Sequence, residues 1–281
     1  MHYDALETRS AAERQADLTA KLIYQVALAK AKSPYFAEAL KDLGEISSFD
    51  DLSKLPVLNK SDLPKLQSQN TPFAGLNAIA PHEMANIFRS PGPIWDAAGA
   101  IGREHDHWKT GRGLKAAGIG AGDIVLNCFS YHWTPAGRMF ESGAHAVGAA
   151  VVPAGVGQTD LQVEAISQLG VTTYAGTPDF LQVILDKASE VGADVSSLAK
   201  ALVSGGALFP AMRAKYQEQG IDVLQAYGTA DVGIIAYEVP GEDGSLPQGM
   251  IINEDMIVEL LDPVTREPVA EGDVGEVVVT N

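Results

Sequence analysis

The chain has 281 residues, 46% of them hydrophobic and 20% charged, which is the composition of a globular protein with a sizeable core. Its formal net charge of −16 at pH 7 argues against nucleic acid or an anionic membrane as a partner, because the summed field repels both. The single cysteine, Cys128, excludes an internal disulfide and is expected in the core. The sequence shows neither a signal-peptide pattern nor the roughly 18 consecutive apolar residues of a membrane span, so a cytoplasmic protein is expected.

The first 80 residues are predicted to form a helical segment that packs on the main domain. A first helix is expected over residues 11–31, with one apolar face formed by Leu18, Leu22, Ile23 and Val26. Ser33 and Pro34 have the pattern of a helix cap followed by proline at the first helical position, which predicts a short helix through Leu40. Two more short helices are expected over 49–55 and 60–67.

From residue 86 on, apolar runs typical of strands alternate with patterns typical of helices, which predicts an α/β fold with a parallel-rich sheet layered by helices. Strands are expected over 86–90, 123–129, 149–153, 172–175, 199–204 and 222–227. Helices are expected over 104–117, 135–147, 160–169, 178–191 and 210–219. A C-terminal antiparallel hairpin region is expected from 257–261 and 276–280. The predicted domains are therefore 1–80 and an incomplete α/β domain, 81–281.

Glycines and polar residues stand at the ends of four of the predicted strands, at 131–134, 155–159, 204–207 and 227–231. Because ligands of open α/β sheets bind outside the carboxyl ends of the strands, we expect these segments to open on one crevice. Thr229 offers a hydroxyl and Asp231 a carboxylate after the strand that ends at Tyr227. The alternative is a strand that turns into another over 233–239, with Asp231 solvated.

Three aromatic residues, Tyr131, His132 and Trp133, stand in the loop after the strand over 123–129. Apolar rings with polar tips are typical of a small-molecule pocket, although such a loop also serves to cover a helix end. The common signatures of a dinucleotide site, a P-loop and a serine nucleophile are absent from the sequence, and its histidines lack the spacing of a metal-ligand pair.

The chain resembles the phenylacetate-CoA ligases, a family of the adenylate-forming superfamily, over nearly its whole length. The shared motifs, in chain order, are Ser33-Pro34-Tyr35, Leu55-Pro56, Lys60-Ser61-Asp62-Leu63, Gly157-Gln158-Thr159, Thr177-Pro178, Tyr227-Gly228, Glu254-Asp255, Asp262-Pro263 and Gly275-Glu276. The resemblance implies an AMP-forming ligase that joins an aryl or related carboxylic acid to coenzyme A through an acyl-adenylate. It implies ATP, AMP, Mg²⁺ and coenzyme A as ligands and leaves the oligomeric state open, a homodimer included.

The resemblance also implies residue roles. The nucleotide is assigned to Ser90, Gly92, Gly205, Gly206, Ala207, Ala226, Tyr227, Gly228 and Thr229. Thr229 and Asp231 are assigned to catalysis, with Asp231 also holding Mg²⁺. The acid pocket is assigned to Tyr131, His132, Trp133, Gly155 and Gly233.

The sequence departs from the family pattern at several of these positions. The family's phosphate loop, S-S-G-T-T-G-K-P, is replaced by S-P-G-P-I-W-D-A over residues 90–97, and the family's Gly-Gly-Glu ends in Ala207. Pro91 and Pro93 remove backbone donors. If Asp96 lay about 4 Å from a phosphate, the repulsion would be about 4 kcal/mol at an effective dielectric near 20. Weak binding of triphosphate is therefore expected.

The family's mobile C-terminal lid lies beyond the last residues of this chain, so the chain by itself is expected to lack full turnover. Two alternatives to the ligase stay open at this point. One is a ligase-like protein that binds an acyl group or a CoA thioester without adenylating it, and the other is a scaffold that retains only the fold.

Overall fold

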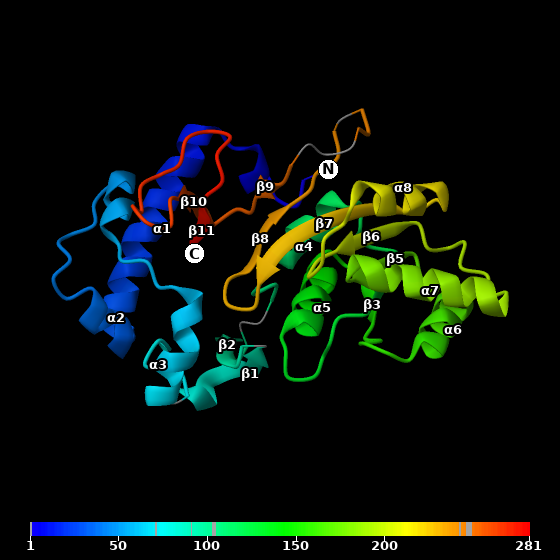
Figure 1. Ribbon diagram of the computed structural model, residues 1–281, viewed down its shortest axis with the longest axis horizontal. Coiled ribbons are helices and arrows are strands. Elements are labelled where there is room, and N and C mark those ends of the chain that lie inside the picture. The colour runs from blue at the N-terminus through cyan, green and yellow to red at the C-terminus, as the bar shows by residue number, and fades with distance from the viewer. Residues whose placement is uncertain (1, 71, 91, 103–104, 242, 246–248) are drawn as a thin grey trace. The chain divides into compact units, whose positions relative to one another are not determined.

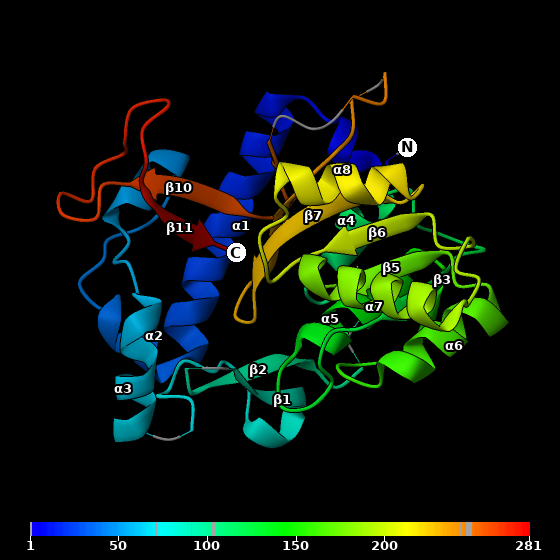
Figure 2. The same ribbon diagram turned by 45° about the vertical axis from the view of Figure 1, so that its right-hand side comes forward.

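The computed structural model describes residues 2–70, 72–90, 92–102, 105–241, 243–245 and 249–281 (Figures 1 and 2). The chain divides into two compact units. Unit 1 comprises Met1–Asp4 and Gly102–Asn253, and unit 2 comprises Ala5–Ile101 and Glu254–Asn281. The predicted division at residue 80 stays a prediction about folding domains.

Unit 1 is built on a seven-stranded sheet with the strand order β4-β3-β5-β6-β7-β8-β9. Its strands are β3 (Ile124–Asn127), β4 (Ala150–Val152), β5 (Thr173–Gly176), β6 (Lys200–Val203), β7 (Asp222–Thr229), β8 (Gly233–Tyr237) and β9 (Ile251–Ile252). The neighbours from β4 to β7 pair in parallel, whereas β8 pairs antiparallel with β7 and β9. The predicted α/β class with a parallel-rich sheet is confirmed.

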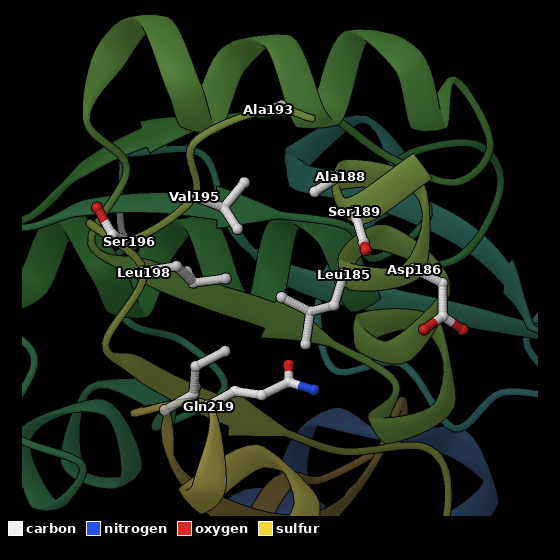
Figure 3. A pocket seen from close by; sticks show the side chains of 10 residues that line it. Leu185, Asp186, Ala188, Ser189, Ala193, Val195, Ser196, Leu198 and Gln219 are labelled. Carbon is white, nitrogen blue, oxygen red and sulfur yellow. The ribbon is translucent and has the colours of Figure 1, made fainter. Parts of the chain in front are cut away.

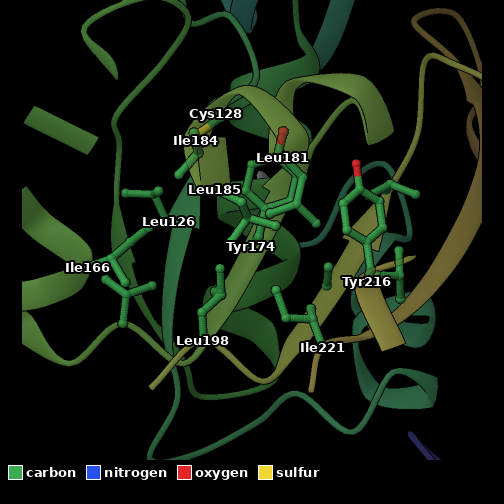
Figure 4. Packing of buried hydrophobic residues seen from close by; sticks show 14 of the residues in the cluster. Leu126, Cys128, Ile166, Tyr174, Leu181, Ile184, Leu185, Leu198, Tyr216 and Ile221 are labelled. Atoms are coloured by element: carbon green, nitrogen blue, oxygen red, sulfur yellow. The ribbon is translucent and has the colours of Figure 1, made fainter. Parts of the chain in front are cut away.

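Helices cover both faces of this sheet (Figures 1 and 2). They are α4 (Thr110–Ala116), α5 (Ala136–Ala146), α6 (Thr159–Leu169), α7 (Pro178–Val191) and α8 (Pro210–Glu218). The face under α6, α7 and α8 carries an apolar cluster that includes Leu126 of β3 and Val203 of β6, together with Leu181 of α7 (Figure 4). Cys128 packs in the same cluster, as expected of a core thiol.

A buried ion pair joins α8 to β8 within unit 1. Arg213 Nη2 donates to both carboxylate oxygens of Glu238, at 2.7 and 2.8 Å, and the two side chains are 10% and 5% exposed, respectively. Glu238 also accepts from the backbone N–H and the side-chain amide of Gln225, at 2.8 and 2.9 Å. The middle of β7 is thereby fixed by charge-assisted hydrogen bonds as well as by its strand neighbours.

Unit 2 combines the helical start of the chain with two antiparallel hairpins. Its helices are α1 (Ala11–Lys32), α2 (Pro34–Ala39) and α3 (Leu63–Gln69), with 3₁₀ turns at Ala5–Thr8, Phe49–Lys54, Lys60–Asp62 and Pro81–Glu83. Its strands are β1 (Met84–Ser90), β2 (Ile94–Ala100), β10 (Ile257–Leu261) and β11 (Glu276–Thr280). The predicted C-terminal antiparallel pair is confirmed, because β10 pairs with β11 from Ile257 to Leu261.

Long-range contacts tie α1 to the segment that precedes β10. Leu18 and Leu22 pack in a cluster with Ile257. Arg9 bridges Asp17 at 2.7 Å and Glu254 at 2.6 Å. Unit 2 therefore depends on residues from both ends of the chain.

Several predicted elements of unit 2 need correction. Ile23 was expected on the buried face of α1 but is 38% exposed, since the buried stripe follows Leu18 and Leu22. The short helix predicted over 49–55 is a 3₁₀ helix, Phe49–Lys54, and the helix predicted over 60–67 is split into a 3₁₀ turn and α3. The cap at Ser33 is confirmed, because its side chain accepts from the backbone N–H of Phe36.

The strand predicted over 86–90 lies outside the parallel sheet. It belongs to β1, which pairs antiparallel with β2 over Met84–Ser90. Gln67 of α3 closes the other side of β2, since its amide accepts from Trp95 N at 2.8 Å and donates to Trp95 O at 2.9 Å. Local pattern alone did not distinguish this hairpin from the start of the parallel sheet.

The helix predicted over 104–117 begins later, at Thr110. The side chain of Asp106 accepts from the backbone N–H groups of Thr110 and Gly111, at 2.8 and 3.1 Å, which starts the helix there. Lys109, with φ 58°, has left-handed backbone and interrupts the helical run before it. Glu104 lies outside the described residues.

Candidate functional site

The carboxyl ends of the five parallel strands share one edge of the sheet of unit 1. The segments that follow β3, β4, β6 and β7 are those singled out from the sequence, and the strand order brings them to this edge. Parallel sheets bind ligands at this edge. A shared crevice between the segments stays a prediction.

The backbone of Gly205 and Gly206 lies against the two preceding strand ends. A Cβ atom added to Gly205 would stand 3.7 Å from Thr177 Cγ2, after β5, and 3.9 Å from the ring of Phe129, after β3. The two glycines are exposed, and Gly205 has a φ of 72°, where a side chain is strained. The edge thus contains a stretch of open backbone that a flat ligand can approach closely.

Two buried tyrosines support the turn beside these glycines. Tyr174 Oη donates to Thr177 O at 2.9 Å, and Tyr216 Oη donates to Pro178 O at 2.6 Å. Both rings are fully buried (Figure 4), and burial raises the pKa of each hydroxyl. The hydroxyls therefore stay protonated and hold the turn from beneath.

The aromatic loop after β3 is anchored by Asn127, whose side chain is fully buried. Its amide donates to Tyr131 Oη and to Gly137 O, both at 2.8 Å. Burial, aided by Glu141, raises the pKa of Tyr131. His132 and Trp133 are exposed, and Trp133 has left-handed backbone with φ 65°. The structure thus holds Tyr131 against the loop's own base and presents the other two side chains to solvent.

The stretch around Tyr227 forms a β-hairpin. The sequence predicted a strand that ends at Tyr227, but β7 continues to Thr229, with a bulge between Tyr227 and Gly228, and pairs with β8. The bulge absorbs the glycine that was expected to end the strand. Tyr227 is 44% exposed, Thr229 is half-buried, and Asp231 is exposed at the hairpin tip.

Gly233 has a packing role within unit 1. A Cβ atom added to it would lie 2.4 Å from the carbonyl oxygen of Trp108, and its φ is 85°. Ile234 N also donates to Trp108 O at 2.9 Å. Close approach of two backbones therefore accounts for the glycine, while its assignment to the acid pocket stays a prediction.

Gly155 lies in the loop after β4, next to Asn127. Its N–H donates to Asn127 O at 3.0 Å, and its carbonyl accepts from the amide of Gln162 at 2.8 Å. The loop before α6 is therefore fixed to the strand that carries the aromatic segment, and Gly155 lies beside the base of that segment.

Ser90 and Gly92 belong to unit 2, where the predicted phosphate loop forms the turn and second strand of the β1–β2 hairpin. Asp96 is only 8% exposed and lies on the inner face of this hairpin, opposite Phe88. Strand alternation turns the Asp96 side chain to the buried face of the hairpin, and its effect on a bound phosphate stays a prediction. Pro91 lies outside the described residues.

A pocket of ≈ 470 Å³ in unit 1 lies at the opposite, amino edge of the sheet (Figure 3). It is lined by Leu185, Asp186, Ala188, Ser189, Ala193, Val195, Ser196, Leu198, Gln219 and Ile221. Its walls are the final turns of α7 and α8 and the segments that enter β6 and β7, so it contains none of the predicted site residues. We therefore base the candidate site on the strand ends.

Among the described residues, no group of three or more His, Cys, Asp or Glu side chains is arranged to hold a metal ion. The described helices are too short or too polar to cross a membrane. Asp231 is the side chain predicted to hold Mg²⁺. Protein sites for Mg²⁺ often use one or two carboxylates together with phosphate oxygens. One exposed carboxylate at the hairpin tip is compatible with such a site.

Comparison with solved structures defines the class of fold. A structure of 2-hydroxyisobutyryl-CoA ligase in the postadenylation state with 2-HIB-AMP matches 96% of this chain and 60% of that chain, with a TM-score of 0.85 and 21% identity. The architecture is therefore that of this ligase. The chain belongs to the AMP-binding enzyme family, whose family model matches residues 99–281.

Relatives of known name also match the chain over nearly its whole length. A phenylacetate-coenzyme A ligase of Aromatoleum evansii is 29% identical over 99% of this chain, and one of Escherichia coli (strain K12) is 28% identical over 99% of it. The chain spans 64% and 65% of the lengths of these two relatives. The resemblance noted from the sequence is confirmed.

Sequence reasoning missed the residues that support the edge. Asn127 is a polar residue in an apolar strand, and that exception was the available signal. Tyr174 and Tyr216 gave no such signal, because aromatic residues are common in strands and helices of a core. Their hydrogen bonds join segments whose proximity depends on the finished fold.

Proposed function

We propose that the chain carries the nucleotide- and acid-binding part of an AMP-forming ligase of the phenylacetate-CoA ligase type. Such an enzyme joins an aryl or related carboxylic acid to coenzyme A through an acyl-adenylate. Family membership supports the reaction class, and the open backbone of Gly205–Gly206 at the carboxyl edge is the observation that carries the proposal.

The base of the nucleotide would lie on the backbone from Gly205 to Ala207 and beside Tyr227. Thr229 and Asp231 would hold the α-phosphate together with Mg²⁺, which supplies positive charge to the phosphate oxygens. The half-buried position of Thr229 and the exposed position of Asp231 in the β7–β8 hairpin support this role. The N–H groups and hydroxyl of the hairpin would then orient the α-phosphate for attack by the acid's carboxylate, which forms the bond to phosphorus as the bond to the leaving pyrophosphate breaks.

The acid would be received by the loop from Tyr131 to Trp133 and by Gly155. Asn127 links these two segments, since it bonds Tyr131 Oη through its side chain and Gly155 N through its backbone. A flat apolar acid with one carboxylate suits such a loop better than a flexible chain. An arylacetate is therefore expected to bind more tightly than a straight-chain acid of similar size.

Binding measurements with AMP, ATP plus Mg²⁺, CoA and phenylacetate test the proposal. AMP at about 100 times its dissociation constant stabilises the folded state by roughly 2.7 kcal/mol, which a thermal shift detects. Asp231→Asn should weaken the binding of ATP in the presence of Mg²⁺ more than it weakens the binding of AMP alone. Asp222→Asn removes an exposed carboxylate from the opposite end of β7 and serves as the matched control. If the protein binds none of the four compounds, the proposed ligase function is contradicted and a scaffold is favoured.

A second candidate is a ligase-like protein that binds an acyl group or a CoA thioester without adenylating it. The segment over 90–97 favours it, because it lacks the family's threonines and lysine and forms a hairpin strand with Asp96 turned inward. This candidate predicts binding of CoA or phenylacetyl-CoA with no response to AMP or ATP. The same set of titrations therefore separates the two functions.

A further inference from the structure

Asp179 places an exposed carboxylate beside the open backbone at the carboxyl edge. It is the second residue of α7, directly after the turn that follows β5. A Cβ atom added to Gly206 would stand 4.0 Å from Asp179 Oδ1. Since Gly206 has no side chain and Ala207 offers no polar side-chain atom, this carboxylate borders the surface on which a flat ring can lie.

The backbone that carries Asp179 is held in place from beneath. Tyr174 and Tyr216 donate their hydroxyls to the carbonyls of Thr177 and Pro178, the two residues that precede it. A turn fixed by buried hydrogen bonds loses little freedom when a ligand binds, so its side chain can contribute to recognition at low entropic cost. The carboxylate is thus presented on a rigid support.

We propose that Asp179 selects the base of the nucleotide by accepting a hydrogen bond from the exocyclic amine of adenine. The inference rests on the proposed function, since it assumes that the base lies on Gly205–Gly206. A carboxylate offers acceptors only, and the 6-amine is a donor at the edge of the ring. Hydrogen bonds to a charged acceptor are stronger than those between neutral groups.

Comparison of two nucleotides tests this contact. AMP and purine riboside 5′-monophosphate differ only in the 6-amine, so the ratio of their dissociation constants isolates its contribution. Isothermal titration calorimetry should show that the protein binds AMP roughly tenfold more tightly, as one hydrogen bond to a charged group provides. Asp179→Ala should reduce the ratio to near one, while Asp179→Asn, which keeps an acceptor oxygen, should retain part of it.

Any general effect of the lost charge on phosphate binding cancels in this ratio, because both ligands carry the same phosphate. Asp186→Ala, which removes another exposed carboxylate from α7, should leave the ratio unchanged. Tight AMP binding with an unaltered ratio in Asp179→Ala would overturn the role of Asp179 and leave the proposed function standing. Absence of AMP binding to the unsubstituted protein would instead contradict the proposed function, and the inference with it.

Discussion

Removal of one partner from the buried Arg213–Glu238 pair should destabilise unit 1 strongly. Arg213→Met keeps an unbranched apolar stem but leaves the Glu238 carboxylate without its guanidinium, although Gln225 still donates to it. Both residues are buried, with 8% and 4% of their surface exposed, so water cannot take the place of the lost charge. Loss of one partner of such a pair costs about 3–5 kcal/mol.

Hydrogen exchange of peptides from β7 and β8 measures this loss within unit 1 alone, because it reports the local free energy of opening. The double variant Arg213→Met with Glu238→Met should be less destabilised than the sum of the two single variants, by about 2 kcal/mol or more, since neither charge is then left buried by itself. Arg138→Met is the matched control. Arg138 is 53% exposed in its pair with Glu141, and its loss should cost less than about 1 kcal/mol. A cost for Arg213→Met as small as that of the control, or single effects that simply add, would refute the reasoning.

Three further outcomes are expected. Gly233→Ala should destabilise the protein by about 3 kcal/mol or more, because its Cβ would overlap Trp108 O at 2.4 Å, whereas Gly118→Ala, with φ 72° and open space around it, should cost only about 1 kcal/mol; equal melting temperatures would contradict the packing argument. Burial raises the pKa of the Cys128 thiol to about 12, so a thiol reagent at neutral pH should label it only after denaturant is added, and fast labelling of the native protein would show a different environment. Burial alone would raise the pKa of Asp123, but hydrogen bonds from Lys200, Thr172 and Gly120 N to its charged form bring the pKa below the ordinary 3.8. The charged carboxylate therefore stabilises the folded state above pH 3.8, and this stabilisation is lost as pH falls through the lower folded pKa. Asp123→Asn should make the melting temperature depend less on pH between about pH 5 and pH 2, and the same acid profile in the variant as in the unsubstituted protein would exclude the contribution.

The parallel sheet could be predicted because each of its strands is a short apolar run between turn residues, as in Ile124–Asn127. The β1–β2 hairpin could not, since its pairing depends on contacts that local pattern does not reveal. Pro91 and Pro93 made the segment between its strands resemble a loop, and Asp96 interrupts the apolar alternation of the second strand. The side-chain amide of Gln67, in helix α3, completes the hydrogen bonding of Trp95 in β2, and this contact cannot be predicted from local sequence.

The candidate site shows the same limit. Glycines and polar residues after strands indicated the edge correctly, because that relation follows from strand direction alone. The supporting contacts depend on which segments become neighbours. Asn127 reaches Tyr131 within one loop, but Tyr216 reaches Pro178 across 38 residues of chain, and such a hydrogen bond follows from the packed core rather than from local sequence.

The dependence of unit 2 on both ends of the chain has a consequence for synthesis on the ribosome. Leu22 leaves the exit tunnel long before Ile257, its partner in the same apolar cluster. At 5–20 residues per second, the intervening chain takes roughly 10 to 50 s to be made. During that interval the apolar stripe of α1 lacks Ile257, while the main segment of unit 1, Gly102–Asn253, emerges and can fold. The region from Gly102 to Asn253 is therefore expected to fold before unit 2 is complete, and the apolar stripe of α1 to need protection until Ile257 has emerged.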